Sequence, residues 1–200
     1  MFPRQALAAN GVSRIRPNDF SFPQCNKVRF TFPAHGNWGS LVLYWYDGGI
    51  RPNVPEELAA EGRGLPGTGR MFVGDKGIIL DSALIPEKKM RDYQQAKGIT
   101  PPPAPAGGRG GRGGGGGGDA WVTAFRNNEV SPGDFQKAAA VTEGLNLAAI
   151  ASRVSRRAFT GGGGRTAPVL AWDSQNMKFT NVNEANQYLS REYREGWKLA

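Results

Sequence analysis

Side chains suited to nucleophilic or metal chemistry are scarce in this sequence. Cys25 is its one cysteine and His35 its one histidine, which excludes an internal disulfide, an all-cysteine metal site and a histidine pair for zinc. The two lie ten residues apart across an expected strand, and the sequence has no Gly-x-Ser-x-Gly elbow. We therefore assign no catalytic residue and no metal ligand, and we expect His35 to be an exposed turn histidine.

A glycine pattern formally matches a cofactor-binding motif. The stretch "GRGLPG" places Gly62, Gly64 and Gly67 at the spacing of GxGxxG. That fingerprint works when a strand delivers the glycine turn and a helix follows, with its N-terminal amides aimed at pyrophosphate. Here "PEELAAE" precedes the glycines and the strand-like "RMFVG" follows them. We therefore expect a connecting loop, and no cofactor bound by this chain.

A second glycine-rich stretch, Gly107 to Gly118, contains two Arg-Gly-Gly units and raises the question of RNA binding. Such binding needs arginines that neutralise phosphates and aromatic rings that stack on bases. Only Arg109 and Arg112 are present, and no aromatic residue lies between Tyr93 and Trp121. Two phosphate contacts give a weak, salt-sensitive association. We therefore favour an expanded surface loop over a nucleic-acid site.

The elements that would position a site begin with two strands. "KVRFTF" alternates apolar and polar residues, the pattern of a strand with one buried face, and "SLVLYWYDGG" is apolar on both faces, which predicts a central, well-covered strand. Asp47 ends the second strand at a turn signal. Residues at strand ends often contribute to sites, although an aspartate there more commonly makes the turn. Tyr46 and Asp47 are the candidate substrate-side residues.

Later segments complete the expected fold. "FVGDKGIIL" predicts a hairpin with its turn at residues 74–77, and "IPEKKMRDYQQAK" predicts a short exposed helix. A helix over "DAWVTAFRN", a long helix from Asp134 and a strand "PVLAW" follow. Gly144 inside the long helix suggests a close neighbour, and the spacing of Asn181 and Glu184 suggests a capping box that begins an amphipathic terminal helix. The expected class is α+β: an open, mostly antiparallel sheet with helices packed on one face.

Composition sets limits on the class of protein. The chain has 200 residues, 39% of them hydrophobic, which fits one domain with a real core. The net charge of +8 comes from scattered residues interleaved with acids, the pattern of a solvated surface. No apolar run approaches the roughly eighteen residues of a membrane span, and the N-terminus lacks a signal-peptide core. We expect a cytoplasmic protein without membrane association.

Four blocks in order carry a family resemblance: "VRFTFPA", "LVLYWYDGGIRPNVPEEL", "GRMFVGDKGIIL" and "LAWDSQNMKFTNVNEANQYLSREYREGW". They resemble the C-terminal α/β domain of the Gfo/Idh/MocA oxidoreductases, in the bacterial branch with the "WYDGG" and "FVGDKG" signatures. The similar region covers residues 26–199 and is interrupted by the Pro/Gly-rich loop at about 100–118, with residues 1–25 as an N-terminal lead-in.

The resemblance implies one half of a two-domain enzyme. In this family an N-terminal Rossmann domain binds NAD(P), and the C-terminal domain closes the substrate pocket and makes the subunit interface. Typical reactions are hydride transfers on sugars, inositols and glycosides. The family's catalytic lysine, in a Glu-Lys-Pro motif, and its acid/base histidine have no matching position here, since "IPEKKM" has its proline before Glu87. The resemblance therefore implies either the remaining half of a split or truncated gene, or a chain that works beside a separate Rossmann domain or subunit. An upstream export signal would make the protein periplasmic.

Two functions from different classes remain open. The first is a substrate-pocket and oligomerisation domain of an NAD(P)-dependent sugar or glycoside oxidoreductase, inactive alone. The second is an independent binding module that uses the Arg-Gly-Gly loop for nucleic acid or another acidic partner. In the first case we also expect a homo-oligomer formed through the outer face of the sheet. Neither face of "LVLYWY" is polar enough to meet water comfortably, and we expect the long helix and the terminal helix to cover only the other face.

Overall fold

The computed structural model describes residues 5–10, 21–100, 117–131, 133–160 and 168–197. These residues form two compact units. The larger unit combines Met1–Arg51 with Gly117–Ala200, and the smaller unit comprises Pro52–Gly116. Each unit has its own sheet, so each is described by itself.

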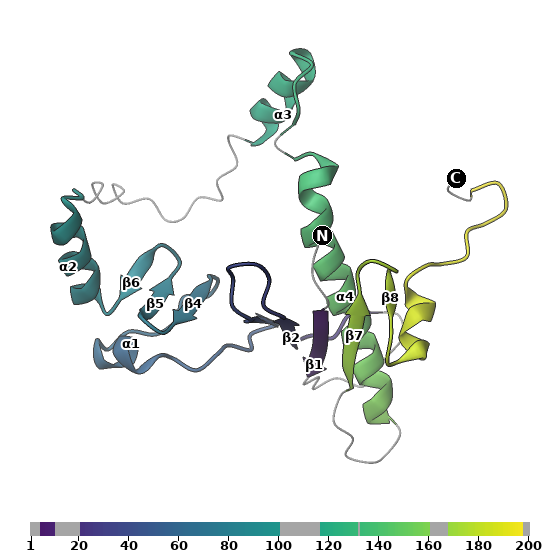
Figure 1. Cartoon of the computed structure of the whole chain (residues 1–200), viewed down its shortest axis with the longest axis horizontal. Helices are drawn as coiled ribbons and strands as arrows, with labels where there is room; N and C mark the ends of the chain where they lie inside the picture. Colours follow the sequence, from purple (N-terminus) through teal and green to yellow (C-terminus); the bar gives the residue numbers. More distant parts are fainter. Residues whose placement is uncertain (1–4, 11–20, 101–116, 132, 161–167, 198–200) are drawn as a thin grey trace. The chain divides into compact units, whose positions relative to one another are not determined.

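The larger unit is built on an open sheet of five strands in the order β3-β2-β1-β7-β8 (Figure 1). All neighbouring strands in it are antiparallel. This arrangement confirms the predicted α+β class with an open antiparallel sheet. The strands are β1 (Gln5–Asn10), β2 (Asn26–Phe32), β3 (Leu41–Asp47), β7 (Val169–Asp173) and β8 (Lys178–Phe179).

One long helix covers one face of this sheet. Helix α4 (Phe135–Thr160) packs against β1, β2 and the 3-10 helix η1 (Asn183–Tyr188) (Figure 1). Alternate residues of β2 are buried under it, as the period of two in "KVRFTF" predicts. The core contains Val28, Phe30, Leu147, Ile150, Ala151, Val154, Leu170, Trp172, Phe179 and Ala185. A further helix, α3 (Gly117–Arg126), is formed where the segment "DAWVTAFRN" predicted one.

Asp134 caps the N-terminus of α4. Its Oδ1 accepts a hydrogen bond of 3.0 Å from the backbone N–H of Lys137, three residues into the turn, and its backbone oxygen accepts the first helical bond from Ala138. The Lys137 ammonium lies 3.3 Å from the same carboxylate. The backbone N–H of Lys137 is the main cause that lowers the pKa of Asp134 from its ordinary value. The cap thus works in the ionised form.

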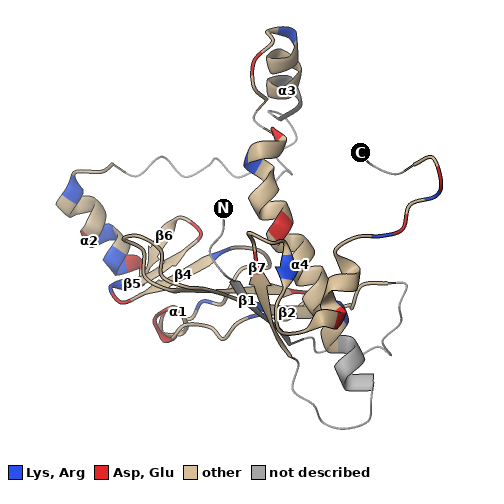
Figure 2. Ribbon diagram, turned by 45° about the vertical axis from the view of Figure 1, so that its right-hand side comes forward, with Lys and Arg blue, Asp and Glu red and all other residues tan. Residues whose placement is uncertain are grey.

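The smaller unit contains a three-stranded antiparallel sheet in the order β4-β5-β6. Its elements are α1 (Glu56–Ala60), β4 (Met71–Gly74), β5 (Gly77–Leu80), β6 (Ala83–Ile85) and α2 (Glu87–Lys97). Gly74 pairs with Gly77, which confirms the predicted hairpin. Helix α2 buries no residue and carries both signs of charge along its length (Figure 2), as expected for a short exposed helix.

The prediction that "SLVLYWY" is a central, well-covered strand is wrong. The described sheet ends at β3, and α4 packs mainly over β1, β2, β7 and η1. β3 is therefore an edge strand whose first five residues are exposed. Exposed fractions over residues 41–45 of β3 run from 40% at Val42 to 59% at Leu41, while Tyr46 and Asp47 are half-buried. The middle of the sheet is occupied instead by β1, which comes from residues 1–25, the expected lead-in. A run of alanines gave little sign of a strand, because alanine is depleted in strands.

The prediction of an amphipathic terminal helix is also wrong, because the helical part after Asn181 is limited to η1. Asn181 does not cap a helix: its side-chain amide pairs with β7, accepting from the Ala171 N–H at 2.8 Å and donating to the Val169 carbonyl at 2.6 Å. Asn186 makes the same two-sided contact with the backbone of Phe179. The side-chain amides of Asn181 and Asn186 therefore make hydrogen bonds to the backbone of the kind that a neighbouring strand would make. The close neighbour expected at Gly144 is not found among the described residues, since a Cβ added there would meet none of their atoms within 4 Å.

Candidate functional site

The two predicted substrate-side residues lie on opposite faces of β3. Tyr46 is paired with Lys27 and Asp47 with Asn26 in the ladder between β2 and β3. Because successive side chains of a strand alternate, Asp47 shares the helix side with Trp45, whose indole Nε1 donates a hydrogen bond of 3.0 Å to its Oδ2. Tyr46 belongs to the other side. The structure thus does not bring Tyr46 and Asp47 together in one site.

The outer face of β2 and β3, turned away from α4, combines cations with aromatic rings. We call Lys27, Arg29, Tyr44 and Tyr46 the basic aromatic face; in register, Lys27 lies opposite Tyr46 and Arg29 opposite Tyr44. The Lys27 ammonium lies 5.4 Å from the centre of the Tyr44 ring and 5.3 Å from that of Tyr46. The two ring centres are 6.2 Å apart. These distances place the ammonium within cation–π range of both rings.

The charges of the basic aromatic face are available to a ligand. Within the described part of the chain, neither Lys27 nor Arg29 forms an ion pair with a carboxylate. Arg29 is exposed, and Tyr44 keeps 46% of its surface open. The face can therefore hold an anionic group beside a ring that stacks on the tyrosines.

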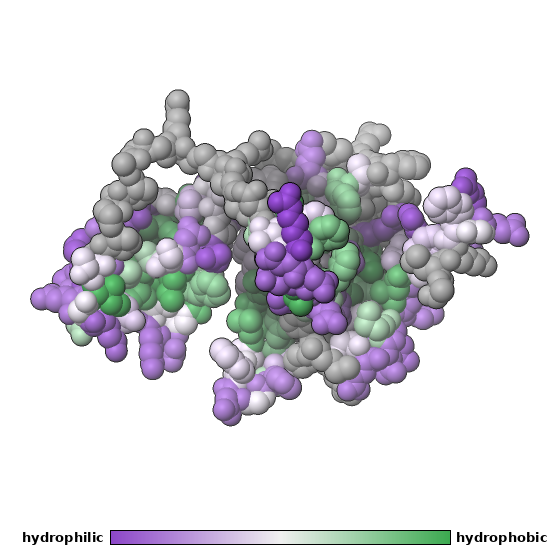
Figure 3. All heavy atoms as spheres, turned by 90° about the horizontal axis from the view of Figure 1, so that it is seen from above, coloured by the Kyte–Doolittle hydropathy of each residue, from purple (hydrophilic) through white to green (hydrophobic). Residues whose placement is uncertain are grey.

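The helix side of β3 has a different character. Leu41, Leu43 and Trp45 point to this side and retain exposed fractions of 59%, 47% and 50%. We call these three residues the apolar ledge. Seen from above, apolar side chains reach the molecular surface between polar ones (Figure 3). The ledge offers contact area to another apolar surface and no group for catalysis.

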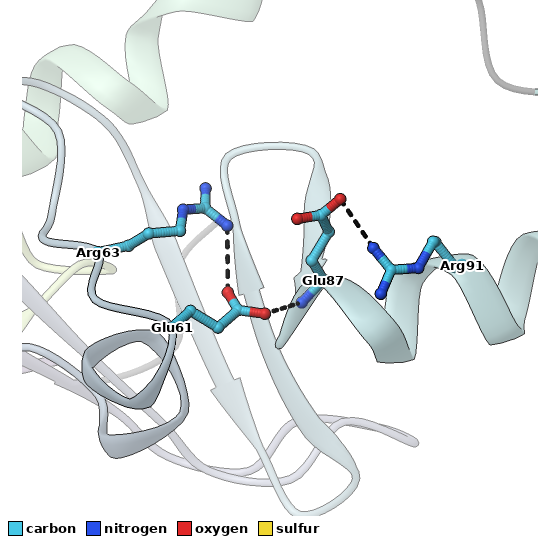
Figure 4. Close-up of polar contacts among 4 residues, drawn as sticks. All are labelled: Glu61, Arg63, Glu87 and Arg91. Atoms are coloured by element: carbon cyan, nitrogen blue, oxygen red, sulfur yellow. Dashed lines mark hydrogen bonds and ion pairs between the residues drawn. The ribbon is translucent and has the colours of Figure 1, made fainter.

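A cavity of about 230 Å³ lies within the smaller unit. Its apolar wall comes from β5, β6 and α2, and its charged lining comes from Arg63 and Glu87. Glu61 joins these two: its Oε1 accepts a hydrogen bond of 2.7 Å from the backbone N–H of Glu87, and its Oε2 lies 3.2 Å from an Arg63 Nη1 (Figure 4). The Glu87 carboxylate in turn pairs with Arg91 at 2.9 Å. The charges at this cavity thus neutralise one another and cap α2, which leaves the basic aromatic face as the better binding site.

The remaining candidates from the sequence lie in turns, in a loop or in partly buried positions. His35 forms a backbone pair with Trp38 at 3.0 Å in a tight turn and is exposed, as predicted, while Cys25 is half-buried. Gly62 has a φ of +68° just after α1, and the segment from there to β4 is a connecting loop, as expected. Arg109 and Arg112 lie outside the described residues. Their proposed loop role remains a prediction.

Sequence reasoning missed Lys27, Arg29 and Tyr44 as site residues. The alternation of "KVRFTF" already places Lys27 and Arg29 on one face, and that of "LVLYWYD" places Tyr44 with Tyr46. What the sequence does not contain is the register, which sets Lys27 against Tyr46. Local patterns predict faces, and only the pairing of the strands predicts which residues meet across them.

The described residues contain neither a cluster of metal-ligating side chains nor a membrane-spanning helix. Across the described ranges, no three His, Cys, Asp or Glu side chains converge in a way that could hold a metal ion. No helix in those ranges is long and apolar enough to cross a membrane. In comparisons with known proteins, no family model, no curated protein and no solved structure matches the chain.

Proposed function

We propose that this chain is the substrate-pocket and oligomerisation domain of an NAD(P)-dependent sugar or glycoside oxidoreductase of the Gfo/Idh/MocA type. It would work with a Rossmann domain that binds the nicotinamide cofactor and carries the hydride. This chain's contribution is to bind and orient the substrate with the residues of the sheet. A second copy would cover the apolar ledge.

The observation that carries the proposal is the stretch "WDSQNMKFTNVNEAN", which lies within the longest block of the family resemblance. Its polar side chains form hydrogen bonds with defined backbone groups. Asp173 accepts hydrogen bonds from the backbone N–H groups of Gln175 and Asn176 in the turn between β7 and β8. Asn181 and Asn186 then hold the following segment against β7 and Phe179. A block in which so many polar residues have backbone partners specifies a fold, so the resemblance in these residues supports the same domain architecture.

The residues of this chain indicate which domain would bind the cofactor and which the substrate. Its GxGxxG match lies between a helix and a strand, in the reverse of the order that aims amides at pyrophosphate. The cofactor would therefore be bound by the partner domain. The sheet supplies hydrogen-bonding and stacking groups at Tyr44 and Tyr46, which suit a polyhydroxylated ring.

The test combines binding and reconstitution. We expect calorimetric titration of the chain with NADH or NADPH to show no binding, and a panel of sugars to shift the NMR signals of β2 and β3. Mixing with a separately purified Rossmann domain of a family enzyme should give sugar-dependent NAD(P)H formation, which Tyr46→Ala reduces. Micromolar cofactor binding by the chain alone would refute the proposal. So would binding of a single-stranded oligonucleotide with no response to any sugar.

A further inference from the structure

We infer that the basic aromatic face binds an anionic sugar, with its carboxylate or phosphate between Lys27 and Arg29 and its ring against Tyr44 and Tyr46. The assignment of a sugar rests on the proposed function. The requirement for an anion rests on the structure alone. Four side chains of two neighbouring strands make the site, and no other element is needed to complete it.

The first step is the geometry of the four residues. Directly opposed residues of an antiparallel pair have Cβ atoms roughly 5 Å apart, and residues two apart on a strand lie about 7 Å apart. Lys27 and Tyr46 form one such opposed pair, and Arg29 and Tyr44 form the next. Cations thus occupy one strand and rings the other. A ligand lying across the ladder meets an anion-binding side and a stacking side at once.

The second step is the state of the cations. Contact with the two rings orients the Lys27 ammonium, and a ring contact leaves its positive charge in place. Its three N–H donors are shared with no carboxylate among the described residues, and the same holds for the guanidinium of Arg29. One carboxylate or phosphate can accept charge-assisted hydrogen bonds from both. An uncharged sugar lacks this interaction.

The third step separates a small anion from other occupants. A second copy stacked on this face would bring four cations together, so self-association is disfavoured here by like-charge repulsion. A nucleic-acid strand would gain only two phosphate contacts, which bind weakly and in a salt-sensitive way. A compact ligand with one anionic group and one ring matches two cations and two rings.

The experiment compares five probes by NMR titration of the whole chain: glucuronate, glucose-6-phosphate, glucose, inorganic phosphate and a short oligouridylate. The two anionic sugars should bind more tightly than glucose and more tightly than inorganic phosphate. Lys27→Gln and Arg29→Gln should each weaken them about tenfold, the effect of losing one charge-assisted hydrogen bond. Tyr44→Phe should keep most of the affinity, whereas Tyr44→Leu should lose it, because stacking needs the ring.

Lys178→Gln is the matched control. Lys178 is exposed and lies on the same outer face, since its pair partner Asp173 adjoins the buried Trp172. It lies three strands from β2, about 14 Å away, which exceeds the Debye length at moderate salt. Removing its charge should therefore leave the affinity unchanged. All variants should keep the far-UV circular dichroism of the wild-type chain.

The outcomes distinguish a failure of this inference from a failure of the proposed function. If glucose binds as tightly as glucuronate and Lys27→Gln has no effect, the inference fails while the proposed function stands. Equal losses in Lys27→Gln and Lys178→Gln would overturn it as well, because the effect would then be one of overall charge. Inorganic phosphate binding as tightly as the sugar anions would remove the role of the rings. If only oligouridylate binds, both the inference and the proposed function fail.

Discussion

Replacing Trp45 by glutamate should abolish self-association of this protein. Trp45 lies on the apolar ledge with half of its surface exposed, at the sheet edge that β3 forms. Edge strands of natural proteins are usually short, charged or covered. The seven residues of β3 carry one charge, Asp47, at the end of the strand. Within the described residues this edge and the ledge are open, so we expect a second copy to cover them.

The size of the effect follows from the exposed fraction. Full burial of a large apolar side chain contributes about 1.5 to 3 kcal/mol, so covering the remaining half of Trp45 contributes about 1 kcal/mol. In a two-fold dimer the residue counts twice, which gives about 2 kcal/mol, or roughly thirtyfold in the dissociation constant. Burying two glutamates would add to this loss. The fold of each copy should persist, because an exposed edge position contributes little to it.

Sedimentation velocity over a hundredfold range of concentration measures the effect. The wild-type chain should shift from monomer to dimer across tens of micromolar, and Trp45→Glu should remain a monomer throughout. Tyr93→Glu is the control, since Tyr93 has a similar exposed fraction of 46% but lies on α2 in the smaller unit. A wild-type chain that stays monomeric, or equal effects of the two substitutions, would refute the reasoning.

Three further predictions concern the stability of the fold. Leu170→Ala should lower the free energy of unfolding by about 2 to 5 kcal/mol in urea, because the side chain is fully buried in the core; a change below about 1 kcal/mol would contradict this. Gly48→Ala should lower the melting temperature more than Gly49→Ala. Both glycines have positive φ, but only at Gly48 would a Cβ collide with Gln24 and Cys25, so equal effects would contradict the geometry. Asp134→Ala should lose stability at neutral pH. Because the pKa of Asp134 is lowered in the folded state, this difference should be present above the ordinary value of 3.8 and disappear as the pH falls through the folded pKa; a gap that persists in strong acid would argue against the cap.

Local signals predicted much of the fold. The hairpin at Gly74 to Gly77, helix α2 and strand β2 follow from glycine spacing, a helix-initiating proline and a period of two. Each of these depends on residues close in the chain. The α+β class then follows from the order of the elements. Such features are determined by interactions between residues close in the chain, so the sequence pattern alone is enough to predict them.

Features that depend on distant partners were not predictable in the same way. Asn181 and Glu184 have the spacing of a capping box, yet the Asn181 amide binds the edge of β7, twelve residues back at Val169. A side-chain amide carries both a donor and an acceptor, so it can serve a helix or a strand equally well. Whether a strand edge lies within reach is a property of the tertiary fold.

The two faces of β3 also explain why its sequence suggested a central strand. A strand buried on both sides and an edge strand with two binding faces both lack the simple polar alternation. On the helix side, the apolar ledge favours contact with a partner surface. On the outer face, Lys27 and Arg29 lie on β2 beside Tyr44 and Tyr46, and like-charge repulsion between these cations disfavours contact with a second copy. We therefore expect a dimer to bury the helix side of β3, and not the outer face that the sequence suggested, and to leave the outer face open to ligand. Association and anion binding would then be compatible, and adding glucuronate should leave the dimer's dissociation constant unchanged.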